Sequence, residues 1–106
     1  MGYIYCLFDI KNNITRVGKT KTKDKSRQKQ QLGYYPFTLL EWTFKVNNYG
    51  DVETDIHRQF KKHKCNGDWY SLNITKVLEY IMNNHIWEEL DSPSPSKVLS
   101  VMVNNT

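Results

Sequence analysis

The sequence is poor in cysteine and has no long apolar segment. Its two cysteines, Cys6 and Cys65, are far apart, and neither belongs to a C-x-x-C pair. Clustered cysteines are the usual sign of a disulfide framework or a zinc site, so their absence argues against both. No apolar run approaches the ~20 residues of a membrane helix, and no signal peptide is recognisable. We therefore expect an intracellular, soluble protein without a membrane partner (cytoplasmic, or nuclear if the source is a eukaryote or its virus).

Acidic residues are scarce in one part of the chain. Eight of the fifteen Lys and Arg fall between Lys11 and Lys29, where Asp24 is the only acid. From Asn66 onward, two basic residues stand against five acidic ones. Such an asymmetry suits a polyanion bound on one face, although a solvated basic surface gives the same pattern.

The pattern of apolar residues predicts one small α/β (α+β) domain with an antiparallel sheet. The 106 residues are enough to bury roughly 65% of the unfolded surface. A Ser-Pro linker at residues 92–96 separates this domain (residues 1–91) from an apolar tail at 97–103, so the C-terminal segment is 92–106. The expected strands are 3–9, 14–18 and 37–46, with a short extended piece at 68–72; the expected helices are 24–32, 51–63 capped by Asp51, and one capped by Thr75.

Two familiar site patterns fail on spacing. Gly18-Lys19-Thr20 resembles the end of a phosphate-binding P-loop, but the glycine required five places earlier is Asn13. His57, His63 and Cys65 lack a fourth zinc ligand at a sensible spacing, because His85 is remote.

Glu53 and His57 share one face of the helix predicted at 51–63, because they are four residues apart. This pair is either an ordinary helical Glu–His contact or a metal-binding carboxylate beside an accessory acid or base. Trp69 and Tyr70 are either part of a functional site or core aromatics, and we expect the second, since large rings in a short extended segment usually pack in the interior.

The order of these pieces resembles the GIY-YIG nuclease superfamily. Tyr3-Ile4-Tyr5 and Arg16-Val17-Gly18 correspond to its two signature triplets, and an arginine and a helical glutamate follow. The resemblance extends from residue 2 to about 82. It is strongest to the branch named for a phage reading frame and a meiotically up-regulated yeast gene, through Gly-x-Ile-Tyr, Val-Gly-Lys-Thr, Glu-x-x-x-His and Asp-Trp-Tyr.

The resemblance implies a three-stranded antiparallel sheet flanked by helices and a catalytic set at the hairpin. Tyr5 would activate or place the attacking water, with Lys19 and Arg16 as nearby cations. Arg27 would stabilise charge on the phosphoryl oxygens. Glu53 would hold Mg²⁺ or Mn²⁺, and His57 would transfer a proton or contact phosphate. The expected contacts to the DNA backbone are Arg16, Lys21, Lys23, Lys25 and Lys29.

Two positions depart from the family pattern. Arg16 replaces the tyrosine of the second triplet, and Gln31 replaces a histidine. We expect a metal-dependent endonuclease that hydrolyses DNA phosphodiester bonds with low sequence specificity. The alternative is a nucleic-acid-binding module of the same fold without catalysis, and a third reading is a protein-interaction domain. The apolar tail indicates docking onto a groove or a second subunit.

Overall fold

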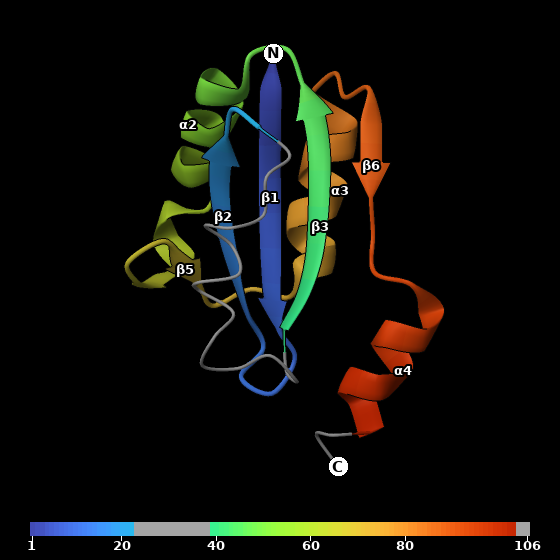
Figure 1. Cartoon of the computed structure of the whole chain (residues 1–106). Helices are drawn as coiled ribbons and strands as arrows, with labels where there is room; N and C mark the ends of the chain where they lie inside the picture. Colours follow the sequence, from blue (N-terminus) through green and yellow to red (C-terminus); the bar gives the residue numbers. More distant parts are fainter. Residues whose placement is uncertain (23–38, 104–106) are drawn as a thin grey trace.

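The computed structural model describes residues 1–22 and 39–103. The helix predicted at 24–32 lies outside these residues. So do the predicted site residues Lys23, Lys25, Arg27 and Lys29, and Gln31. The described chain forms an α+β domain built on one antiparallel sheet, with the strand order β4-β5-β2-β1-β3-β6 (Figure 1). In chain order the elements are β1 (Gly2–Asp9), β2 (Ile14–Thr20), β3 (Leu39–Val46), α2 (Tyr49–Gln59), η1 (Lys61–His63), β4 (Lys64–Asn66), β5 (Trp69–Tyr70), α3 (Ile74–Asn84), β6 (Glu89–Asp91) and α4 (Pro95–Val103).

The prediction of a three-stranded sheet was wrong, because the described residues alone form a sheet of six strands. The three predicted strands are its long members, β1, β2 and β3. The other three, β4, β5 and β6, are two or three residues long. β5 lies within the short extended piece predicted at 68–72. Strands this short show no alternation of apolar and polar residues, so periodicity does not detect β4 and β6.

Hydrogen bonds from side chains within the segment stabilise the turn between β1 and β2. The Asp9 carboxylate accepts hydrogen bonds from the backbone N–H of Lys11 (3.1 Å) and from Nδ2 of Asn12 (2.8 Å). Asn13 takes a left-handed backbone conformation with φ of 53°, which asparagine tolerates better than most residues. The turn predicted at residues 11–13 is confirmed.

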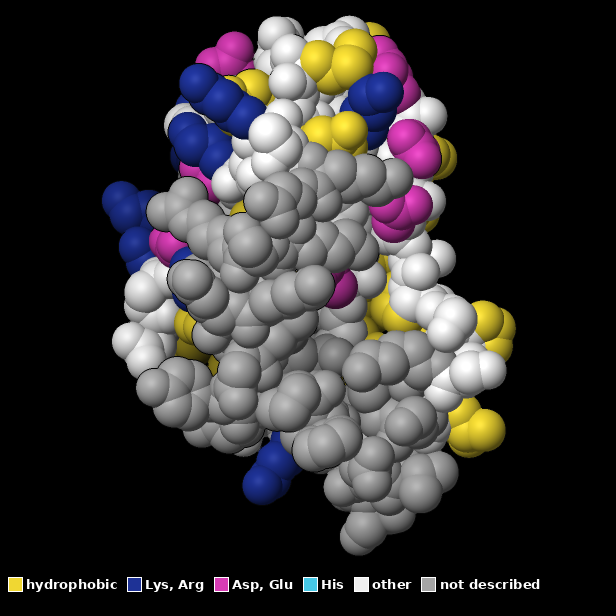
Figure 2. Space-filling model, in the orientation of Figure 1, with side chains coloured by type: hydrophobic (Ala, Val, Ile, Leu, Met, Phe, Trp, Pro, Cys, Tyr) yellow, Lys and Arg dark blue, Asp and Glu magenta, His cyan; other side chains and the backbone are white. Residues whose placement is uncertain are grey.

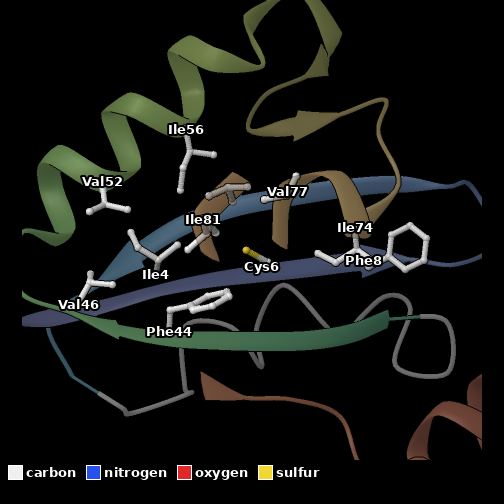
Figure 3. Packing of buried hydrophobic residues seen from close by; sticks show 11 residues of the cluster. Ile4, Cys6, Phe8, Phe44, Val46, Val52, Ile56, Ile74, Val77 and Ile81 are labelled. Carbon is white, nitrogen blue, oxygen red and sulfur yellow. The ribbon is translucent and has the colours of Figure 1, made fainter. Parts of the chain in front are cut away.

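The core lies between the sheet and the two helices α2 and α3, which cover the same face (Figure 1). Alternate residues of β1, Ile4, Cys6 and Phe8, point into it. Figure 3 shows Val52 and Ile56 of α2 facing these side chains. Burial raises the pKa of the Cys6 thiol to about 12, so this cysteine stays protonated and inert.

Both predicted helix caps were misplaced by two or three residues. α2 follows Asn48, and Asp51 lies in its first turn. There its negative charge still stabilises the helix, because it lies near the positive end of the helix dipole. α3 is capped by Asn73, whose Oδ1 accepts a hydrogen bond from the backbone N–H of Thr75 (3.0 Å). Neighbouring Asn, Asp and Thr residues compete for the same cap, and spacing alone does not decide among them.

The C-terminal part of the chain contains a strand and a helix that were not predicted. β6 pairs with β3, and α4 begins at Pro95, the residue favoured in a first helical turn. α4 lies beside β3, with Leu99 63% and Met102 52% exposed. The division at residue 91 and the docking of the tail onto a partner stay predictions. No helix of the described residues is long and apolar enough to cross a membrane.

One polar cluster joins α2 to the end of α3. Oδ2 of Asp55 accepts hydrogen bonds from the Tyr80 hydroxyl and from Nε2 of His85, each at 2.7 Å. The Tyr80 bond, and then the His85 bond, hold the pKa of Asp55 below its usual 3.8 against the opposing effect of burial. The hydrogen bond to Asp55 raises the pKa of the Tyr80 hydroxyl.

We predict that Asp55→Asn lowers the free energy of unfolding by about 1 kcal/mol at neutral pH, a modest loss because the side chain is 34% exposed. The folded-state pKa lies below the unfolded one, so the contribution is present above the unfolded pKa and is lost as the pH falls through the folded pKa. Urea unfolding at pH 7 and near pH 3 measures both. A wild type–variant difference that grows toward acid would contradict the assignment.

Candidate active site

The β1–β2 hairpin sets Tyr5 directly opposite Gly18. A Cβ atom on Gly18 would lie 2.2 Å from Cζ and 2.3 Å from the hydroxyl oxygen of Tyr5. The tyrosine ring therefore lies across the glycine, and no larger residue fits beneath it. This contact explains why the two triplets occur together: the second supplies the space that the side chain of the first occupies.

The hairpin also delivers Lys19 to the opposite face of the sheet. Lys19 is the register partner of Ile4, so it shares the face covered by the helices, whereas Tyr5 leaves β1 on the other face. β2 pairs with β5 only through Thr15 and Arg16. Tyr5 and Lys19 thus flank one stretch of β2 that has no paired strand on its outer side among the described residues.

Helix α2 presents Glu53 to this lysine. Oε1 of Glu53 lies 3.7 Å from Nζ of Lys19, and its Oε2 lies 3.9 Å from Nε2 of His57, one helical turn further on. The side chains of Glu53 and His57 are 21% and 24% exposed, so both remain open to a ligand. The predicted Glu–His pair therefore lies beside the hairpin.

Tyr70 holds the other side of the His57 ring. Its hydroxyl forms a hydrogen bond with Nδ1 of His57, and the two rings lie 5.4 Å apart. Burial, and then the charges of Asp68 and Glu53, raise the pKa of Tyr70. The hydroxyl therefore stays protonated at neutral pH and fixes the imidazole beside Glu53.

These side chains border two open cavities. Glu53, His57 and Tyr70 line one of about 490 Å³, together with Arg58, Lys61, Lys64 and Asp68. Lys19 and Lys21 line a larger one of about 680 Å³, beside the N-terminal end of α2. The smaller cavity is the candidate site, because it contains the carboxylate and the imidazole.

Arg16 differs from the other predicted DNA contacts. One of its terminal nitrogens lies 3.5 Å from Oδ2 of Asp68, and its Nε is buried without a hydrogen-bond partner among the described residues. Its side chain is 22% exposed, so the guanidinium is largely held within the protein. Lys21 is exposed at the larger cavity. Arg27, Lys23, Lys25 and Lys29 are outside the described residues.

Glu53 is the side chain best suited to a divalent metal. The described residues contain no group of three or more His, Cys, Asp or Glu side chains arranged for one. Mg²⁺ commonly uses only one or two carboxylates, and completes its shell with water and substrate phosphates. Among the described residues, the nearest cation and imidazole lie 3.7 and 3.9 Å from Glu53, so its oxygens have no closer ionic partner there and fit this mode of binding.

Sequence reasoning missed the part that Tyr70 plays. Tyr70 is 1% exposed, so its reading as a core aromatic was correct, but its hydroxyl also reaches His57. The signal was the Asp-Trp-Tyr motif, which β5 places against β2. Arg58, Lys61 and Lys64, which line the same cavity, were not predicted either, because they lie outside the basic stretch from Lys11 to Lys29.

The paired triplets, the antiparallel sheet and the helical glutamate beside the hairpin define a GIY-YIG-related, nuclease-like domain. The T5orf172 domain model matches residues 2–85, and the chain belongs to this family, which is named for a reading frame of phage T5. The predicted family is confirmed. No curated protein and no solved structure matches the chain significantly.

We predict that Gly18→Ala destabilises the domain by about 1–3 kcal/mol, because the new methyl group must displace the Tyr5 ring. Gly50→Ala is the matched control. Its Cβ would meet only Nζ of Lys19, at 3.9 Å, and alanine favours the α2 helix by roughly 0.5–1 kcal/mol. Thermal and urea unfolding measure both variants. Equal stability of the two would show that Tyr5 does not occupy the space over Gly18.

Proposed function

We propose that the protein is a metal-dependent nuclease that hydrolyses DNA phosphodiester bonds with low sequence specificity. The observation that carries this proposal is the position of Glu53 between Lys19 and His57. Lys19 of the hairpin and Glu53 of α2, far apart in the sequence, meet on the helix-covered face of the sheet, whereas Tyr5 lies over Gly18 on the other face. Family membership supports a nuclease-like domain. The combination of a carboxylate that can bind a metal, a lysine and an imidazole supports hydrolysis.

Each side chain has a role suited to its surroundings. Lys19 is 47% exposed and binds a non-bridging phosphate oxygen at the free stretch of β2. Tyr5 orients the attacking water from the other face of the strand, and the proton that the water loses as it bonds to phosphorus passes to solvent. His57, held by Tyr70, donates a proton to the leaving oxygen as its bond to phosphorus breaks. Arg27, by resemblance, neutralises charge on the phosphoryl group.

Glu53 would hold the Mg²⁺ or Mn²⁺ ion. When bound there, the ion supplies Lewis-acid stabilisation of the charge that develops on the phosphate oxygens. Glu53 also keeps His57 oriented, because the imidazole Nε2 faces its carboxylate.

The alternative is a DNA-binding module of the same fold without catalysis. The observation that favours it is the pairing of Arg16 with Asp68 at 3.5 Å. At the position where the second triplet has a tyrosine, this chain has a guanidinium engaged within the protein. The hydroxyl of that tyrosine is lost, and Arg16 does not replace it as a free donor.

We predict that Glu53→Gln lowers DNA cleavage by at least ~100-fold while the fold and DNA binding persist, since it removes the charge that a metal needs at nearly constant size. Tyr5→Phe should also lower cleavage by removing the hydroxyl. Nicking of supercoiled plasmid with Mg²⁺ or Mn²⁺ measures both effects.

Glu79→Gln is the control, because Glu79 is exposed on α3 and undergoes the same chemical change. Equal nicking by wild type, Glu53→Gln and Glu79→Gln would place the activity elsewhere or in a contaminant. If the wild type binds DNA in a salt-sensitive way but never nicks it, the binding module is the correct reading.

A further inference from the structure

A second basic segment follows the candidate site along the chain. Arg58 lies in the last turn of α2, Lys61 in η1 and Lys64 at the start of β4, and all three are exposed. Figure 2 shows Lys and Arg side chains projecting on the side of the molecule where α2 and β5 lie in Figure 1. A run of charges is usually only a solvated surface. Its position relative to the candidate site therefore decides whether it can bind a ligand of that site.

These three cations line the same cavity as Glu53 and His57. Among the described residues, each of the two carboxylates of that cavity forms a loose ion pair with a cation of β2 and none with the second segment. Glu53 lies 3.7 Å from Lys19, and Asp68 lies 3.5 Å from Arg16. The basic charge of the second segment is therefore not cancelled within the cavity.

Lys61 and Lys64 carry most of this excess. Arg58 also acts on Asp55 on the other side of α2, where its charge helps to lower the pKa of that carboxyl. Within the described part of the chain, no carboxylate forms an ion pair with Lys61 or Lys64. Lysine is a flexible point charge that contacts phosphate without reading bases, and β4 lies at the outer edge of the sheet, where a long ligand has access.

We infer that Lys61 and Lys64 bind backbone phosphates of the DNA adjacent to the phosphate that Lys19 binds beside Glu53 and His57. Lys19 and Lys21 line the cavity on the other side of Glu53, so the bound strand runs from β2 across the candidate site to η1 and β4. The inference rests on the proposed function, which supplies DNA as the ligand, and it adds a second contact surface outside the stretch Lys11–Lys29.

The test is DNA binding without cleavage. Fluorescence anisotropy with a labelled duplex in EDTA, over a range of NaCl concentrations, gives the slope of log K against log salt. Lys61→Gln/Lys64→Gln should weaken binding at low salt and make the slope shallower by about 1.8, since each phosphate contact contributes roughly 0.9.

The control is Lys45→Gln/Lys76→Gln, which removes the same charge from β3 and α3, outside both cavities. Its slope should equal that of the wild type. If both double variants change the slope equally, the effect is one of net charge and the inference is wrong. If the wild type nicks plasmid and binds duplex but Lys61→Gln/Lys64→Gln leaves the slope unchanged, the inference fails while the proposed function stands. A wild type that neither binds nor nicks DNA overturns both.

Discussion

The register of β1 on β2 determines which side chains of the hairpin reach each face of the sheet. With Tyr5 opposite Gly18, Ile4 and Cys6 enter the core, and Lys19 joins the helix-covered face. A shift by one residue would move every one of these side chains to the other face. The close approach of the Tyr5 ring to Gly18 opposes such a shift, because no other residue of β2 offers the same space. Packing and chemistry thus depend on one contact.

Helix α2 joins the core to the candidate site. Val52 and Ile56 are buried against the sheet, and their neighbours Glu53 and His57 lie at the border of that buried face. Because burial of the apolar pair fixes the rotation of the helix, it also fixes where the carboxylate and the imidazole point. Glu53 therefore meets Lys19 as a consequence of how the core packs.

Local patterns predicted much of this arrangement, and long-range contacts account for what they missed. The hairpin and the Glu53–His57 spacing could be predicted, because strand alternation, an asparagine turn and helical periodicity each act within a few residues. The bond from His57 to Tyr70 could not be predicted, since it depends on β5 pairing beside β2. β6 was missed for a similar reason: three residues become a strand only because β3 offers them an edge.

Under the proposed function, the charges around Glu53 would allow a phosphate to enter at little cost in stability. The Lys19–Glu53 separation of 3.7 Å is loose, and the lysine is 47% exposed. Exposed ion pairs contribute about 0–1 kcal/mol, so Lys19 can turn from the carboxylate to an incoming phosphate without a large loss of stability. A buried, tightly bonded lysine would not be free to do this. In the proposed reaction, this loose pair would give Lys19 two alternating partners, Glu53 in the absence of DNA and the phosphate in its presence. The carboxylate would then be left for the metal.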